Sequence, residues 1–380
     1  MRALHPIRRL ARRTGAAAFA AVVLTAGMQT AVTGAQASVR LTSTPTGTNP
    51  YSPAYHHPYR HGVVPTVARL RQMGRWTGAL VSARNLMYGG GIDGIGVTTG
   101  HEKVYLVFYG SQWGTQSTNS NGDATFAGDP SGMAPYLQEL LKGLGTGGER
   151  WSGVMTQYCN SVAIGSQTCP STAPHVRYPT GGALAGVWAD ESTSSPFMAT
   201  GHQLGVEAVN AAAHFGNTTK AANRNAQYVI VSPTGTDPDG WLQNGFCAWH
   251  DYNGDTTLSG GPVSSPYGDI AFTNLPYITD ASVNCGQNFV NSGTAGLLDG
   301  VSIVEGHEYA ETITDQNPAG GWTDSVGAET GDKCAWKTPG TPGGAFDLGT
   351  AHGTFAMQTT WSNLGAAGQG ACQAKHSIVT

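Results

Sequence analysis

The stretch VEGHEYAETITD, residues 304–315, contains the pattern His-Glu-x-x-Glu at residues 307–311. Residues four apart lie on one face of an α-helix, so a helix here places the His307 imidazole beside the Glu311 carboxylate. The related pattern His-Glu-x-x-His holds zinc in metallopeptidases, with its glutamate as general base. The stretch therefore predicts a helix that carries a metal site, with His307 and Glu311 as ligands and Glu308 as the catalytic base.

Acidic residues concentrate around this predicted helix. Eight of the 24 acids lie within residues 299–332: Asp299, Glu305, Glu308, Glu311, Asp315, Asp324, Glu329 and Asp332. A further carboxylate well downstream of such a helix commonly completes a zinc site of this kind, and Glu329 follows Glu311 across a turn at residues 318–321. We therefore expect Glu329 to be the third ligand.

Four other residues remain candidates for supporting roles. Asp324 and Asp332 are alternative ligands, His352 is an alternative to Glu329, and Asp315 is expected to orient His307 from outside the coordination shell. Zinc is the expected ion because imidazole suits it, and calcium is the alternative because carboxylate-rich loops also satisfy a hard cation. One histidine and two carboxylates make a formally neutral zinc site, which is a weaker Lewis acid than two histidines and one carboxylate provide.

The rest of the pattern predicts an α/β (α+β) fold. The expected strands are 103–109, 153–158, 227–232, 270–278 and 353–360, and the expected helices are 133–144 and 196–215. In this order, strands and helices alternate first, and a metal-site helix then follows an edge strand late in the chain. This order is typical of a zincin-like fold, which is a mixed sheet with packed helices. This is an analogy at the level of fold.

The N-terminus has the features of an export signal. Residues 1–37 have five arginines among the first 13 residues, then an apolar run at 15–28, and end in Ala35-Gln36-Ala37, a small-x-small cleavage pattern. Residues 38–100 are expected to be a flexible or propeptide-like lead, and residues 101–380 the globular domain. We expect no further segment long enough to span a membrane, and thus a secreted, extracellular mature chain.

Composition narrows the class of protein further. The formal net charge is −4 and becomes more negative when the arginine-rich leader is removed, which makes a nucleic acid an unlikely partner by charge. The chain has six cysteines, an even number that suits three disulfides in an oxidising compartment. Because short loops close most easily, we expect the sequential pairs Cys159–Cys169, Cys247–Cys285 and Cys334–Cys372.

Several short motifs together resemble bacterial relatives of the plant Exordium, or phosphate-induced, family. They are KVYLVFYGSQWG at 103–114, NAQYVIVSPTG at 225–235, CAWH at 247–250, LDG at 298–300 and GDKC at 331–334. The resemblance spans roughly residues 101–372. It implies a secreted, cell-wall-associated protein. Plant members lack the histidine and glutamate of the 307–311 motif, so their growth role does not carry over.

The leading hypothesis is a secreted zinc peptidase that hydrolyses extracellular proteins or peptides through a metal-activated water. The alternative is a non-catalytic extracellular binding protein, for example for a cell-wall polymer, with a structural ion or none. Nine tryptophans, including Trp322 and Trp336 near the acids, suit sugar stacking. A glycoside hydrolase that uses Glu308 and Glu329 is a third possibility.

Overall fold

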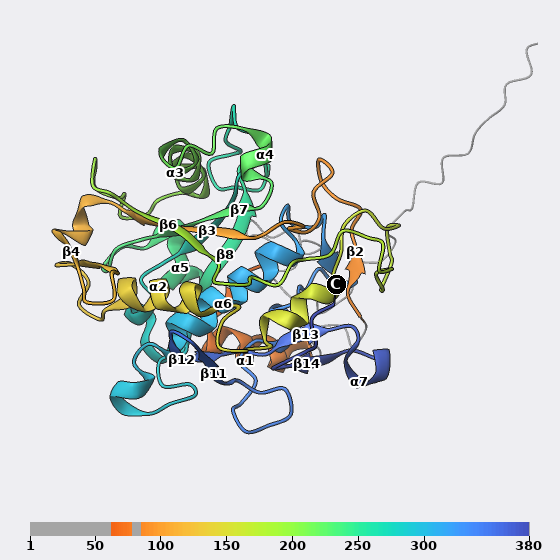
Figure 1. The fold of residues 1–380 in the computed structure, drawn as a ribbon. Coiled ribbons are helices and arrows are strands. Elements are labelled where there is room, and N and C mark those ends of the chain that lie inside the picture. The colour runs from red at the N-terminus through yellow and green to blue at the C-terminus, as the bar shows by residue number, and fades with distance from the viewer. Residues whose placement is uncertain (1–61, 78–84, 380) are drawn as a thin grey trace, which may run out of the picture. The chain divides into compact units, whose positions relative to one another are not determined.

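The computed structural model describes residues 62–77 and 85–379 (Figure 1). The predicted signal peptide, residues 1–37, lies outside the described residues. Among the helices of the described ranges, none is both long and apolar enough to cross a bilayer. The fold is mixed α/β, as the sequence predicted, and three disulfides link its parts.

A six-stranded mixed sheet forms the centre of the described structure. Its strand order is β1 (Val64–Pro65), β8 (Phe246–Tyr252), β9 (Ala271–Leu275), β7 (Ala226–Val231), β3 (Lys103–Tyr109) and β6 (Leu184–Asp190). The β9, β7, β3 and β6 strands run parallel, whereas β8 is antiparallel to β9 and β1 is antiparallel to β8. The interior strands are runs of β-branched and aromatic residues, such as KVYLVFY in β3, because both faces of the sheet are covered.

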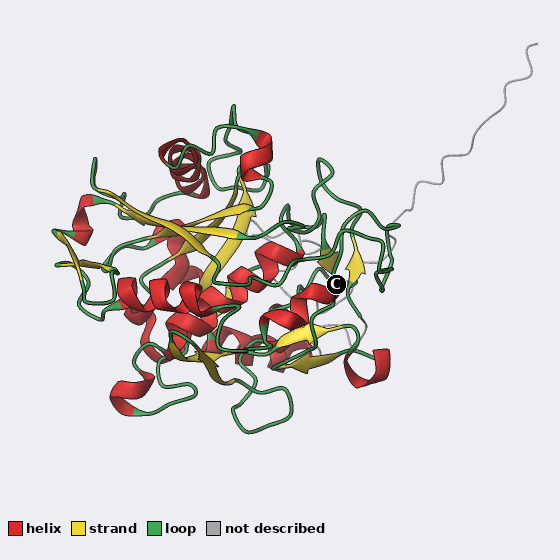
Figure 2. Ribbon diagram, viewed as in Figure 1, coloured by secondary structure: helices red, strands yellow, loops and turns green. Residues whose placement is uncertain are grey.

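Helices cover both faces of this sheet. The α3 helix (Gly201–His214) lies on one face, where Gly205 approaches the Phe272 ring of β9, and the α2 (Met133–Gly143) and α6 (Asp299–Thr314) helices lie on the other (Figures 1 and 2). Thr200 begins α3 with a capping box, in which its side chain accepts from Gln203 N. The layers therefore place α6 directly against β8 and β9.

Short elements surround this core. The remaining helices are α1 (Val67–Thr77), α4 (Lys220–Asn223), α5 (Trp241–Asn244) and α7 (Gly365–Gly368), with 3₁₀ turns at Ser111–Trp113, Ser152–Gln157, Pro238–Gly240, Ile278–Cys285, Gly293–Gly296 and Asp332–Cys334. Four small antiparallel pairs are β2 (Met87–Tyr88) with β10 (Trp322–Thr323), β4 (Gln116–Thr118) with β5 (Ala124–Phe126), β11 (Phe346–Thr350) with β12 (Gly353–Met357), and β13 (Thr360–Ser362) with β14 (Ala371–Gln373).

The α6 helix is buried on every side. All of its residues from Asp299 to Thr314 are buried, between the sheet, α2 and the β11–β12 hairpin. Its polar residues are therefore as enclosed as its apolar ones. Gly306 permits the close packing, because a Cβ there would overlap the Met357 side chain of β12. The polar side chains of α6 therefore need partners inside the protein.

Several sequence predictions of elements are confirmed, and others need correction. The strands at 103–109 and near 227–232, and the helices near 133–144 and 196–215, are present with small shifts of boundary. The expected strand at 153–158 is instead a 3₁₀ turn, since Thr156 Oγ1 donates to Gly153 O at 2.8 Å and Gln157 Nε2 donates to Val154 O at 2.6 Å. The strand before the metal-site helix, β9, lies inside the sheet and not at its edge.

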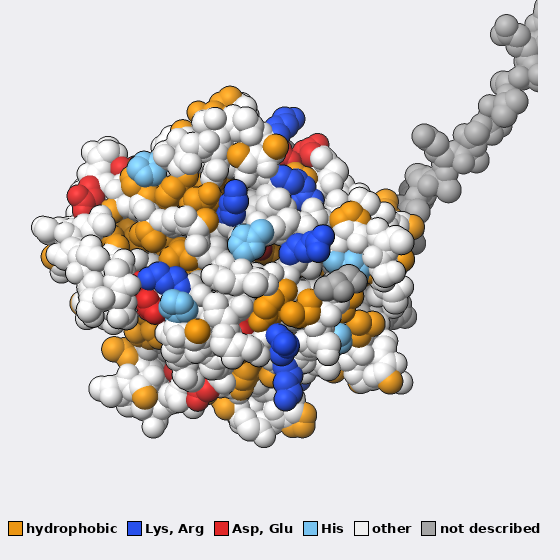
Figure 3. Space-filling view, in the orientation of Figure 1, with side chains coloured by type: hydrophobic (Ala, Val, Ile, Leu, Met, Phe, Trp, Pro, Cys, Tyr) orange, Lys and Arg blue, Asp and Glu red, His pale blue; other side chains and the backbone are white. Residues whose placement is uncertain are grey.

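The cysteine pairs are the sequential ones that the sequence predicted. The bonds Cys159–Cys169, Cys247–Cys285 and Cys334–Cys372 leave no free cysteine. On the face shown in Figure 3, charged side chains lie in several small groups, some of them with both signs, among many uncharged groups. Three disulfides fit an extracellular protein.

The buried carboxyl of Glu102, the residue before β3, should make the stability of the fold depend on pH. Burial raises the pKa of Glu102 to about 8, and a hydrogen bond donated by Gln227 Nε2 at 2.6 Å opposes that rise only in part. Between the ordinary carboxyl pKa and 8, the folded chain keeps a proton that the unfolded chain releases, so this group lowers stability as pH rises. We expect Glu102→Gln to raise the free energy of unfolding at pH 8 by about 4 kcal/mol and to change it little near pH 4.5.

Denaturant titrations at the two pH values check this prediction. The exposed Glu191 provides the control, since Glu191→Gln should leave the pH dependence of the wild-type protein unchanged. Equal slopes of stability against pH in wild type and Glu102→Gln would show that Glu102 carries no raised pKa.

Candidate metal centre

Two elements that face each other position the candidate ligands. The α6 helix carries His307, Glu308 and Glu311, and β8 presents His250 toward it. All four side chains are fully buried. In the β8–β9 register His250 pairs with Thr273, so both point from the same face of the sheet toward α6. The motif helix and a strand far from it in sequence thus contribute to one cluster.

Glu311 lies at the centre of the cluster, with one imidazole near each of its carboxylate oxygens. Its Oε1 lies 3.0 Å from His307 Nε2, and its Oε2 lies 3.7 Å from His250 Nε2. The backbone N–H groups of Gly331 and Asp332 donate to Oε1 at 3.0 and 2.8 Å. Burial acts to raise the pKa of Glu311, but the neighbouring His307 and His250 outweigh it and lower that pKa. Glu311 is therefore held as a carboxylate.

Glu308 has no hydrogen-bond partner for either carboxylate oxygen among the described residues. It is fully buried, and ligand atoms of His250, Glu308 and Glu311 all lie within 4.8 Å of one another. Burial raises the pKa of Glu308 well above its ordinary value, and Glu311 and Glu305 raise it further. A buried carboxyl without a partner costs free energy, so a group at this position calls for a ligand.

The loop after α6 adds two more carboxylates. Glu329 Oε2 lies 3.1 Å from His250 Nε2, and Asp332 Oδ1 lies 3.8 Å from His307 Nε2. Burial, followed by the charge of Glu311, raises the pKa of Asp332 to about 8. Gly331 lets the loop approach, because a Cβ there would lie 2.8 Å from the His307 ring. The structure therefore brings Glu329 and Asp332 to the cluster, each beside a different imidazole.

Three residues that the sequence offered as candidates lie elsewhere. Asp315 does not orient His307: it accepts from the backbone of Ala319 at 2.8 Å and of Gly321, and so holds the turn after α6. Asp324 belongs to neither group of possible ligands among the described residues and forms an ion pair with Lys333 at 3.0 Å. His352 lies on the β11–β12 turn, partly exposed, with its Nδ1 3.1 Å from Glu139 Oε2.

Sequence reasoning missed two residues of the cluster, His250 and Gln358. His307 Nδ1 lies 3.1 Å from Gln358 Oε1, and Gln358 Nε2 donates to Gly331 O at 2.9 Å. Because Gln358 Oε1 can only accept, His307 Nδ1 carries a proton, and Nε2 faces the carboxylate of Glu311. The sequence did contain a signal for the strand that carries His250. The run FCAWHDY begins after Gly245 and is rich in aromatic residues, which is typical of a strand.

The side chains fit a transition-metal ion. Two groups of three possible ligands form around Glu311: His250 with Glu308 and Glu311, and His307 with Glu311 and Asp332. Both imidazoles lie within 3.7 Å of the same carboxylate, one at each oxygen, and each belongs to a different group of possible ligands. Buried carboxylates so close together repel one another, and a divalent cation removes that repulsion.

Comparison of the chain with protein-family models, with curated proteins and with solved structures found no match.

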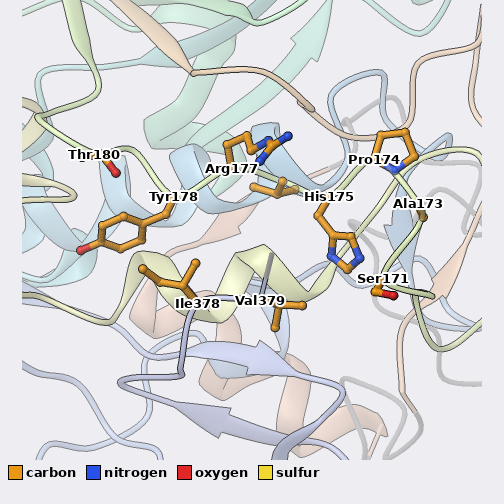
Figure 4. Close-up of a pocket in the computed structure, with 10 residues that line it drawn as sticks. Ser171, Ala173, Pro174, His175, Arg177, Tyr178, Thr180, Ile378 and Val379 are labelled. Atoms are coloured by element: carbon orange, nitrogen blue, oxygen red, sulfur yellow. The ribbon is translucent and has the colours of Figure 1, made fainter.

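A surface pocket elsewhere lacks such chemistry. It has a volume of about 370 Å³, and Figure 4 shows Ile378 and Val379 of the C-terminal segment facing the loop that carries His175 and Tyr178. His175 is held there by contacts of its ring nitrogens with Thr156 O at 2.8 Å and Pro170 O at 3.1 Å. None of the candidate ligands lines this pocket.

Proposed function

We propose that the protein is a secreted zinc-dependent peptidase that hydrolyses extracellular proteins or peptides. The observation that carries the proposal is the position of Glu308: a buried carboxyl without a described partner lies beside His250 and Glu311, and His307 lies at the other oxygen of Glu311. Two histidines and one carboxylate with a neighbouring glutamate are the donor set of catalytic zinc sites in peptidases.

Each residue has a defined part in this proposal. His250, His307 and Glu311 would hold the ion, and the contact of Gln358 with Nδ1 would keep Nε2 of His307 directed toward it. When bound, zinc supplies a Lewis acid that makes water a nucleophile near neutral pH and polarises a carbonyl. Glu308 accepts the proton from that water and passes it to the leaving amine. Glu329 and Asp332 lie beside the imidazoles and complete the acidic lining of the site.

His250 changes the electrostatics that the sequence suggested. With His307, Glu311 and Glu329 as ligands the zinc site would be neutral, whereas two histidines and one carboxylate leave it a net positive charge. That charge makes the ion a stronger Lewis acid. Two imidazoles also favour zinc over calcium, since calcium takes oxygen ligands.

A structural metal site in a non-catalytic extracellular binding protein is the second candidate. The complete burial of His250, His307 and Glu311 favours it, because a catalytic ion must meet water and substrate. Sugar stacking on Trp322 or Trp336 does not support it, since these rings are only 1% and 8% exposed. Under either candidate function, we propose that the protein is secreted and that it is homologous to bacterial relatives of the Exordium family.

Chelator-sensitive hydrolysis tests the proposed function. Protein collected from the medium after secretion should cleave an unfolded protein substrate, lose this activity on treatment with EDTA, and regain it on addition of zinc. His352→Ala is a suitable control because His352 lies away from the cluster. Hydrolysis that persists after the metal has been removed, or no hydrolysis by zinc-loaded protein, would favour the structural site.

A further inference from the structure

A segment near the N-terminus closes over the candidate metal centre. Gly62 is buried with a positive φ of 60°, and a Cβ at this position would overlap the His250 ring and lie 2.8 Å from Glu311 Oε2. The backbone of residue 62 therefore lies directly against two of the proposed ligands. Only glycine meets both demands, the left-handed conformation and the close approach.

The residues that follow Gly62 are paired with the strand that carries His250. Val64 and Pro65 form β1, antiparallel to β8, with Val64 opposite Ala248 and Pro65 opposite Phe246. Within the described sheet β8 has β9 on one side and β1 on the other, so β1 covers its outer edge. An extended peptide that adds to a sheet edge uses the same backbone pairing.

The segment is buried, and contacts with distant parts of the chain anchor it. The side chain of Val64 is fully buried, Trp336 Nε1 donates to Pro65 O at 2.6 Å, and Thr66 N donates to Gly245 O at 2.9 Å. The paired strand has only two residues, and Pro65 has no N–H to donate to the ladder. Because β1 lies at the outer edge of the described sheet, loss of its pairing would leave the β8–β9 pairing in place.

We infer that residues 62–66 are a built-in blocking segment, which holds the position where an extended peptide substrate pairs with β8 and reaches the metal. This inference rests on the proposed function and explains why a centre with catalytic groups is fully buried. The segment slows access in the intact chain, and its displacement opens the site to water and substrate, so the wild-type chain hydrolyses peptides slowly and a chain with the segment displaced hydrolyses them faster. The sequence of the segment further implies that the accepted peptide has a small residue beside the metal and β-branched residues next to it.

A variant that unseats the segment tests the inference on the full-length chain. Val64→Asp places a carboxylate in the buried site of Val64, and Arg71→Asp places one on the exposed part of α1, away from the pairing. Zinc is loaded into both proteins, and the rate of its removal by EDTA is measured together with peptide hydrolysis. We expect Val64→Asp to release zinc faster than wild type by about tenfold or more, and Arg71→Asp to behave as wild type.

A synthetic peptide provides the second measurement. A peptide with the sequence of residues 62–70 should slow zinc release and hydrolysis in Val64→Asp, whereas the same peptide with Gly62→Val should not, since its side chain meets His250. Equal rates of zinc release in wild type and Val64→Asp, with limited proteolysis showing the segment displaced, would overturn the blocking role. Fast release that the peptide reverses, without hydrolysis, would support the blocking role and refute the peptidase. Absence of zinc from all the proteins would overturn both.

Discussion

Glu308→Gln, made in the opened Val64→Asp background, should lower the rate of peptide hydrolysis by about 10² to 10⁴ while zinc content stays at the parent value. An amide has nearly the size and shape of the carboxylate but cannot accept a proton from water. Because Glu308 is fully buried with neither oxygen bonded to a described residue, its replacement by a neutral group should not lower the thermal midpoint. Steady-state hydrolysis, elemental analysis and a thermal scan measure the three quantities.

Glu305→Gln is the matched control for this variant. Glu305 lies one turn earlier on α6, is also fully buried, and has no described hydrogen-bond partner for either oxygen, but it belongs to neither group of possible ligands. Its rate of hydrolysis should therefore remain within a few-fold of the parent. Loss of zinc from Glu308→Gln would instead make this residue a ligand, and an equal loss of rate in both variants would mean that any charge change in α6 disturbs the site.

His250→Ala should weaken zinc binding by more than about 100-fold, since even partners outside the coordination shell contribute about 10-fold to 100-fold. His307→Ala and Glu311→Gln should have comparable effects, because these residues lie on the two sides of the same centre. The control is again His352→Ala, which removes a partly exposed imidazole away from the cluster. Competition with a chromogenic chelator gives the zinc affinity of each variant.

The zinc affinities of His250→Ala and Glu329→Gln show which of His250 and Glu329 is the third ligand. The sequence pointed to Glu329, and the structure places its Oε2 next to His250 Nε2. If His250 is the ligand, Glu329→Gln should keep most of the zinc affinity. If His250→Ala binds zinc like wild type and Glu329→Gln does not, the ligand set inferred from the sequence is the correct one.

The parts of the site that the sequence predicted depend on local geometry. His307, Glu308 and Glu311 lie within one and a half turns of a helix, so their spacing alone predicts that His307 and Glu311 share a face. The predicted helix is present, and its two expected ligands lie 3.0 Å apart. The β3 and β7 strands were predictable for a similar reason, because each is a continuous apolar run of strand length.

The other parts of the site depend on contacts between distant segments. His250 reaches α6 only because β8 pairs with β9 in the register that sets His250 opposite Thr273, and no local pattern gives that register. Asp332 approaches the centre and Asp324 does not, because Lys333 pairs with Asp324 and the backbone of residues 331 and 332 binds Glu311. The position of Gly62 could not be predicted from the sequence either, because Gly62 approaches His250 and Glu311, which are far from it and from each other in the chain.

The zinc content of the wild-type protein tests the central claim most directly. Protein purified without chelators and without added metal is analysed for transition metals and calcium by elemental analysis, with the chain concentration taken from amino-acid analysis. We expect about one equivalent of zinc per chain, since a single centre around Glu311 has two imidazoles within reach. A protein that contains no transition metal, or only calcium, would contradict the assignment of His250, His307 and Glu311 as a zinc centre.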